Sequence, residues 1–159
     1  MKLKLLFACS CIANLICAQE NEKMHMNVPS QRAQSVYGEI GGNGLLFSAN
    51  YDVRFANSQK GLGARIGIGG LIDVITIPVA LNYLAGKAPN YFEGSIGYTY
   101  ATLTDGDESD HGSAIFFSAG YRYQPLKNGF TARVFVSPFV ATDGEGFYFF
   151  GGVSVGYKF

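Results

Sequence analysis

The chain has 159 residues, enough for one domain, and contains 21 Gly, 13 Phe and 10 Tyr but no Trp. Abundant Gly together with strand-forming aromatic residues argues against a helical protein. The 12 basic and 12 acidic side chains give a formal net charge of zero, so nothing in the bulk charge points to a nucleic-acid partner.

Residues 1–18 have the pattern of a secretory signal peptide. Lys2 and Lys4 supply a positive start, and the following run to residue 18 is apolar apart from two polar residues. A small-residue cleavage site then precedes Gln19. The run is too short for a transmembrane helix, which needs about 20 apolar residues. We therefore expect a cleaved signal and export from the cytoplasm.

All three cysteines lie inside this segment: Cys9, Cys11 and Cys17. A mature chain without them has neither a disulfide nor thiolate chemistry. Lipoprotein cleavage at one of them is an alternative, although Ile16 is a poor residue to precede a lipidated Cys17.

Residues 19–35 are polar and aperiodic and are predicted to form a periplasmic lead-in. No later segment has 18 consecutive apolar residues, so a membrane location would require a closed barrel, whose backbone groups are all paired internally. In 61–70, Leu, Ala and Ile alternate with Gly and Arg, the period of a strand with one apolar face. The same alternation predicts seven strands, at 45–55, 61–70, 73–84, 91–103, 113–124, 130–140 and 147–159. A weaker eighth strand is predicted at about 35–41, ahead of a Gly-rich turn at 41–44.

The connectors between these strands alternate in character. Counting back from the C-terminus, 142–146 and 104–112 are acidic, whereas 125–129, 86–90 and 56–60 are short and carry one Lys each. Outer-membrane barrels have short periplasmic turns and longer outer loops. A periplasmic C-terminus therefore places the acidic connectors outside. Because successive connectors alternate between the two sides of the membrane, one more strand is needed before 45–55, which gives an even number of strands. The fold class predicted is all-β: a closed antiparallel up-and-down transmembrane barrel of eight strands over residues 36–159.

The apolar face of these strands is predicted to meet lipid, and the polar face to fill the interior. A soluble lipocalin-like barrel would reverse the faces, but this polar face is small, Gly-rich and poor in charge for a solvated surface. Its charges carry both signs and can pair when enclosed. The predicted interior charges are Glu39, Asp52, Arg54, Arg65, Glu93, Arg122, Arg133 and Lys158. Because an eight-stranded barrel is just wide enough for side chains to fill, we expect a plugged interior rather than a pore.

The last strand carries a recognisable ending, with apolar residues alternating up to a terminal aromatic residue: Val153, Val155, Tyr157 and Phe159. This pattern resembles the signal read by the outer-membrane barrel assembly machinery. Residues 36–159 resemble the small eight-stranded barrels of the OmpA and OmpX type. The resemblance implies the bacterial outer membrane as location, with membrane lipid, lipopolysaccharide and the assembly machinery as partners. We expect a monomer without a cofactor or a nucleic-acid partner.

Two segments are candidates for chemistry. His111 and Ser113 resemble the His-x-Ser pair that lipid A deacylases carry on a barrel strand, where a serine nucleophile needs a nearby base. The family's Glu is missing, since Pro125 stands where it is expected. The acidic residues Asp105, Asp107 and Asp110 could attract a hard cation, but their spacing departs from a calcium loop. A solvated histidine and a hydrated acidic loop are the simpler interpretations, so we expect no metal site.

The favoured function is a structural or surface-interaction role, with a side-chain-filled interior and acidic extracellular loops. The alternatives are a lipid-modifying hydrolase that uses His111 and Ser113, and a narrow channel for small solutes. We expect no enzymatic activity.

Overall fold

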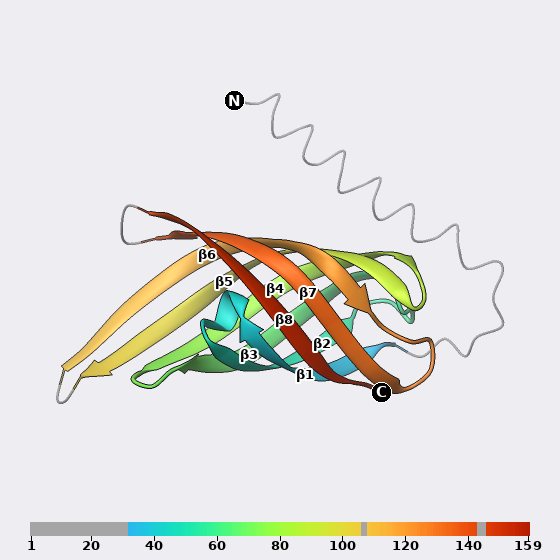
Figure 1. The fold of residues 1–159 in the computed structure, drawn as a ribbon, viewed down its shortest axis with the longest axis horizontal. Helices are drawn as coiled ribbons and strands as arrows, with labels where there is room; N and C mark the ends of the chain where they lie inside the picture. The colour runs from blue at the N-terminus through green and yellow to red at the C-terminus, as the bar shows by residue number, and fades with distance from the viewer. Residues whose placement is uncertain (1–31, 106–107, 143–145) are drawn as a thin grey trace, which may run out of the picture. The chain divides into compact units, whose positions relative to one another are not determined.

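The computed structural model describes residues 32–105, 108–142 and 146–159. Eight antiparallel strands form a closed barrel, in which each strand pairs with its neighbours in sequence and β1 pairs with β8 (Figure 1). The strands are β1 (Gln34–Gly41), β2 (Phe47–Arg54), β3 (Gly61–Leu71), β4 (Val74–Lys87), β5 (Asn90–Asp105), β6 (Glu108–Tyr123), β7 (Gly129–Ala141) and β8 (Phe147–Lys158). The predicted eight-stranded up-and-down barrel is confirmed, including its weakest strand, β1.

Helices contribute little to the described part of the chain. Its one helical element is the short 3-10 turn η1 (Gly42–Gly44), and none of its helices is long and apolar enough to cross a membrane.

The strand ends differ from the predicted bounds at the start of β1 and in the β5–β6 hairpin. β1 begins at Gln34, two residues before the predicted start of the barrel, and pairs there with Val53 of β2. The acidic stretch 104–112 was predicted as a loop, but the ladder between β5 and β6 continues to the pair Asp105–Glu108. That prediction was wrong because acidic composition indicates exposure to water, and an exposed hairpin satisfies its backbone hydrogen bonds as well as a loop does.

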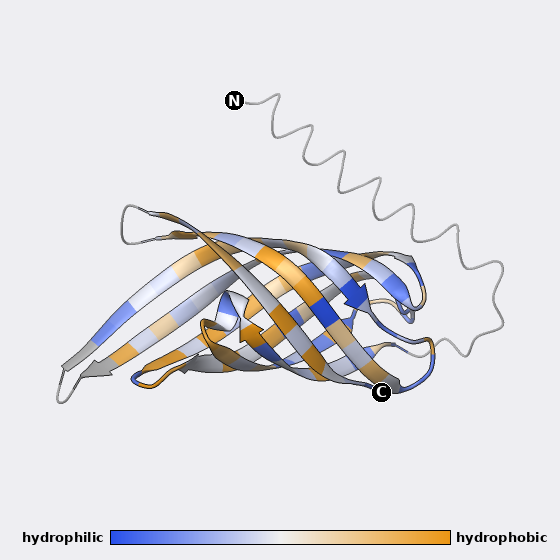
Figure 2. Ribbon diagram, viewed as in Figure 1, coloured by the Kyte–Doolittle hydropathy of each residue, from blue (hydrophilic) through white to orange (hydrophobic). Residues whose placement is uncertain are grey.

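Burial alternates along the strands in the phase that the sequence predicts. In β2, Ser48, Asn50, Asp52 and Arg54 are buried, whereas Phe47 and the residues that alternate with them face outward. Figure 2 shows the same alternation of hydrophilic and hydrophobic residues along the barrel wall. Polar residues inside and apolar residues outside are the reverse of a soluble barrel. The lipocalin-like alternative is therefore excluded.

The first connector folds into the barrel instead of projecting from it. Gly42, Asn43 and Gly44 of η1 are all buried. The Oγ1 of Thr99 donates to the backbone oxygen of Asn43 at 2.8 Å, and the Oγ1 of Thr76 donates to that of Gly44 at 3.2 Å. Only a turn this small fits: a Cβ at Gly42 would lie 2.4 Å from the Phe135 ring. The predicted Gly-rich turn is therefore also a plug.

Candidate functional site

The barrel interior holds the densest set of charged side chains in the described structure. All eight predicted interior charges are at most 4% exposed. They come from every strand except β4, which contributes the buried amide of Asn82. Since successive side chains of a strand point to opposite faces, each charge points inward from a wall whose outer face is apolar. The interior is thus a site assembled from nearly the whole circumference.

Seven of these residues form one continuous chain of ion pairs with alternating sign. In order, the chain runs through Arg54, Asp52, Arg122, Glu93, Arg133, Glu39 and Arg65. Four guanidinium groups alternate with three carboxylates, so each carboxylate lies between two arginines. Burying a charge is costly unless it is paired, and this arrangement gives every interior carboxylate two partners.

In the middle of the chain, two arginines flank Glu93. Arg133 Nη1 donates to Glu93 Oε1 at 2.8 Å, and its Nη2 contacts Glu39. On the other side, Arg122 Nε lies 2.9 Å from Glu93 Oε2 as an ion pair without hydrogen-bond geometry. Arg122 Nη1 also reaches Asp52 at 3.3 Å. Arg133 and Arg122 therefore each join two carboxylates that come from different strands.

The two ends of the chain differ. Asp52 accepts hydrogen bonds from Arg54 and from Asn82, and Arg54 also donates to the backbone oxygen of Gly61 at 3.0 Å. Arg65 Nη1 makes only long contacts, at 3.4 Å to Glu39 and 3.5 Å to the Tyr37 hydroxyl. The Arg65 Nε and Nη2 atoms are buried without a hydrogen-bond partner. The excess positive charge of the interior is therefore least compensated at Arg65.

Aromatic rings accompany the arginines inside the barrel. Arg133 lies 4.3 Å from the ring centre of Phe135 and 5.1 Å from that of Tyr37, while Arg65 lies 5.6 Å from that of Phe116. A guanidinium over a ring face is attracted by about 0.5–2 kcal/mol. Inward glycines make room for the rings: a Cβ at Gly97 would lie 2.4 Å from the Phe116 ring.

These three rings were missed at the level of sequence. The sequence could have revealed them, because each ring lies an even number of residues from a predicted interior charge on the same strand and therefore points to the same side. The pairs are Tyr37 with Glu39, Phe116 with Arg122, and Phe135 with Arg133.

Lys158 is buried but does not belong to the ion-pair chain. Its Nζ donates to three backbone oxygens of the β6–β7 turn, those of Pro125, Leu126 and Lys127, at 2.7–3.2 Å. Lys158 thus ties the end of β8 to a neighbouring turn, a different role from the pairing predicted for it.

His111 and Ser113 lie on one face of β6, the outward face that they share with Ile115. Their side chains contact different residues. His111 Nδ1 lies 3.0 Å from the Tyr100 hydroxyl, and the Ser113 hydroxyl contacts that of Thr142. Neither contact joins the proposed base to the proposed nucleophile.

The candidate cation loop lies mostly outside the described residues. Asp107 and the side chain of Asp105 lie outside the described part of the structure. Asp110 is exposed and accepts a hydrogen bond from the His111 backbone N–H at 2.8 Å. Within the described ranges, no group of three or more His, Cys, Asp or Glu residues could hold a metal ion.

The predicted assembly signal lies on the outer wall of β8. Val153, Val155, Tyr157 and Phe159 are all exposed there. The Phe159 backbone exchanges two hydrogen bonds with Gln34, donating at 2.9 Å and accepting at 3.4 Å. The terminal residue therefore lies at the seam where β8 closes on β1. Its recognition by the assembly machinery stays a prediction.

Comparison with known proteins gives likeness in structure only. No protein-family model matches the sequence, and no curated protein matches it. The N-terminal β-barrel domain of Pseudomonas aeruginosa OprF is similar in structure, with a TM-score of 0.57 and 13% identity over 80% of this chain and 96% of that one.

Two further barrels are more distant. Neisserial surface protein A has a TM-score of 0.49 and 10% identity, over 80% of this chain and 94% of that chain. Ail of Yersinia pestis has a TM-score of 0.44 and 14% identity, over 81% and 99%. With TM-scores below 0.5, these two likenesses support no conclusion about this chain. The closed eight-stranded topology and the likeness to the OprF domain together establish that this chain has the fold of the small outer-membrane β-barrels, the OmpA and OmpX type that its sequence resembles.

Proposed function

We propose that the protein is an integral outer-membrane barrel that serves as a closed scaffold and presents acidic hairpins at the cell surface. The observation that carries the proposal is the inverted polarity of the wall. Large apolar residues such as Ile68, Phe92 and Val155 are about 60% exposed, whereas Arg54 and Glu93 are buried. Exposed apolar surface on this scale is stable only against lipid or a partner.

A closed rather than conducting barrel is supported by what fills the interior. The ion-pair chain joins residues from opposite parts of the wall, and η1 occupies the space next to it. Eight strands leave room for side chains but not for an aqueous channel. Ions would have to cross a region in which every interior carboxylate is already paired with arginine.

The charge of the two rims supports one orientation. With the C-terminus in the periplasm, the three periplasmic turns are 55–60, 88–89 and 124–128. The first contains Lys60 and the last Lys127, and none of the three contains Asp or Glu. The other rim carries Asp73 and Asp110, and the β5–β6 ladder reaches its last pair, Asp105–Glu108, at the same end. Acidic outer hairpins fit a surface that meets lipopolysaccharide through bridging divalent cations or binds a basic partner.

Membrane fractionation with a gel-shift assay tests this proposal. A folded outer-membrane barrel should sediment with the outer membrane and migrate differently before and after boiling. Recovery in the soluble periplasmic fraction, without a shift, would contradict the membrane location. In planar bilayers the folded protein should give no single-channel steps, and regular conductance would contradict the closed interior.

A further inference from the structure

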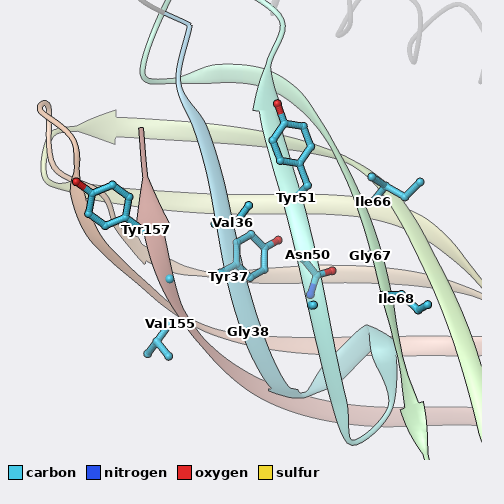
Figure 3. A pocket seen from close by; sticks show the side chains of 12 residues that line it. Val36, Tyr37, Gly38, Asn50, Tyr51, Ile66, Gly67, Ile68, Val155 and Tyr157 are labelled. Carbon is cyan, nitrogen blue, oxygen red and sulfur yellow. The ribbon is translucent and has the colours of Figure 1, made fainter.

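A groove crosses the outer wall of the barrel where β8, β1, β2 and β3 lie side by side (Figure 3). Its floor contains Gly38 of β1 and Ala49 of β2, which are direct partners in the ladder. Gly38 leaves open space, because a Cβ built on it would meet no atom within 4 Å. The groove has a volume of about 730 Å³, within the range of about 300–1,000 Å³ typical of ligand sites.

Larger side chains border this floor on both sides. In the register of the strands, one row contains Tyr157, Val36 and Tyr51, and the row on the other side contains Ile40 and Phe47. Along a strand these rows are four residues apart, or about 13 Å at about 3.3 Å per residue. The middle row consists of Val155, Gly38, Ala49 and Ile68. The two small residues at its centre therefore leave an apolar trench between the raised rows, and Val155 and Ile68 close it on either side.

One end of the groove lies at the level expected for lipid headgroups. Tyr51 and Tyr157 stand close to the periplasmic ends of their strands, and tyrosines in membrane proteins gather at the headgroup level. Arg32, two residues before the start of β1, is exposed at this rim. The described turns on this side carry no carboxylate side chain, so the rim is complementary in charge to an anionic headgroup.

We propose that the groove binds one acyl chain of an anionic glycerophospholipid of the periplasmic leaflet, with the lipid phosphate directed toward Arg32. This inference rests on the proposed function, because it requires the wall to face a bilayer. A second copy of the barrel is a less suitable occupant. Inserted in the same direction, it would bring its own basic rim beside this one, and like charges repel.

Native mass spectrometry can test the site on the protein folded into vesicles of phosphatidylcholine and phosphatidylglycerol and then released into mild detergent. The wild type should retain one phosphatidylglycerol per barrel. Filling the trench with Gly38→Leu and Ala49→Leu should reduce that complex at least tenfold. Ala64→Leu is the matched control: it makes the same change on the same wall, between Val53 and Leu81, and should retain the lipid.

A second arm tests the charge. Arg32→Gln should lower the preference for phosphatidylglycerol over phosphatidylcholine about fivefold, the effect of one basic residue near an anionic surface. Equal retention by the filled variant and the Ala64→Leu control would overturn the proposal. A dimer that forms in the wild type and disappears in the filled variant would also overturn it, in favour of a second copy.

Folding is checked by the gel shift of each variant before mass spectrometry. If the double variant does not fold, Ala49→Leu alone provides the comparison with Ala64→Leu. A wild type that shows no shift and does not insert into vesicles would overturn the proposed function and this inference together. Insertion without lipid retention would overturn only the inference.

Discussion

Glu93 is the central carboxylate of the interior chain, and its replacement tests whether that chain stabilises the barrel. Glu93→Gln keeps the shape of the side chain but removes the negative charge between Arg122 and Arg133. Breaking a buried ion pair by removing one partner costs about 3–5 kcal/mol. We expect a loss near that range and not twice as large, because both arginines keep a second carboxylate, Asp52 or Glu39.

Urea titration of the barrel in vesicles, followed by the gel shift, measures this loss. With a slope of about 2 kcal/mol per molar urea, the midpoint should fall by about 1.5–2.5 M. Arg65→Met is the control. Two of the Arg65 nitrogens are buried without a hydrogen-bond partner, and Glu39 keeps its ion pair with Arg133 after the change. Its midpoint should stay within about 0.5 M of the wild type or rise. An equal loss in both variants would refute the idea that pairing, rather than charge burial in general, governs stability.

Three further predictions concern the wall, the plug and the candidate hydrolase. Ile66→Arg places a charge on the lipid face and should cost about 2–4 kcal/mol of folding free energy in vesicles, whereas Ile72→Arg, at a turn residue that is 94% exposed, should cost almost nothing. Gly42→Val forces a side chain into the Phe135 ring and should displace η1, so that planar-bilayer recordings show leak currents absent from the wild type. Cells that produce His111→Ala should have the same lipid A acylation as cells that produce the wild type, measured by mass spectrometry. A difference between the two would support the hydrolase.

The side of each strand that faces inward could be predicted, because the period of two is an intrinsic property of a strand. Asp52 and Arg54 are two residues apart, so placing one inside places the other. Their partners could not be predicted in the same way. Arg122 reaches Asp52 across the barrel, from a strand that is not its neighbour, and such contacts depend on strand tilt and register around the whole circumference.

The plug formed by η1 could not be predicted either. Four small residues at 41–44 indicate a turn, and on the sequence alone nothing separates a turn that points outward from one that points inward. The deciding groups, Thr76, Thr99 and Phe135, lie on distant strands. Long-range contacts of this kind direct the backbone of the turn into the barrel because they satisfy its polar groups there.

Arginine cannot be exchanged for lysine in the middle of the ion-pair chain. Arg133 uses two nitrogens to contact Glu93 and Glu39 at once, and its guanidinium carbon lies over the Phe135 ring, 4.3 Å from its centre. A lysine ammonium is a point charge that cannot reproduce this fork. Arg133→Lys should therefore lose about 2–4 kcal/mol of unfolding free energy in urea titration, close to a broken buried pair. Arg54→Lys, at the end of the chain with one carboxylate partner, should lose clearly less. A loss near zero in Arg133→Lys would show that the interior needs positive charge alone, and that the geometry of the guanidinium group contributes nothing.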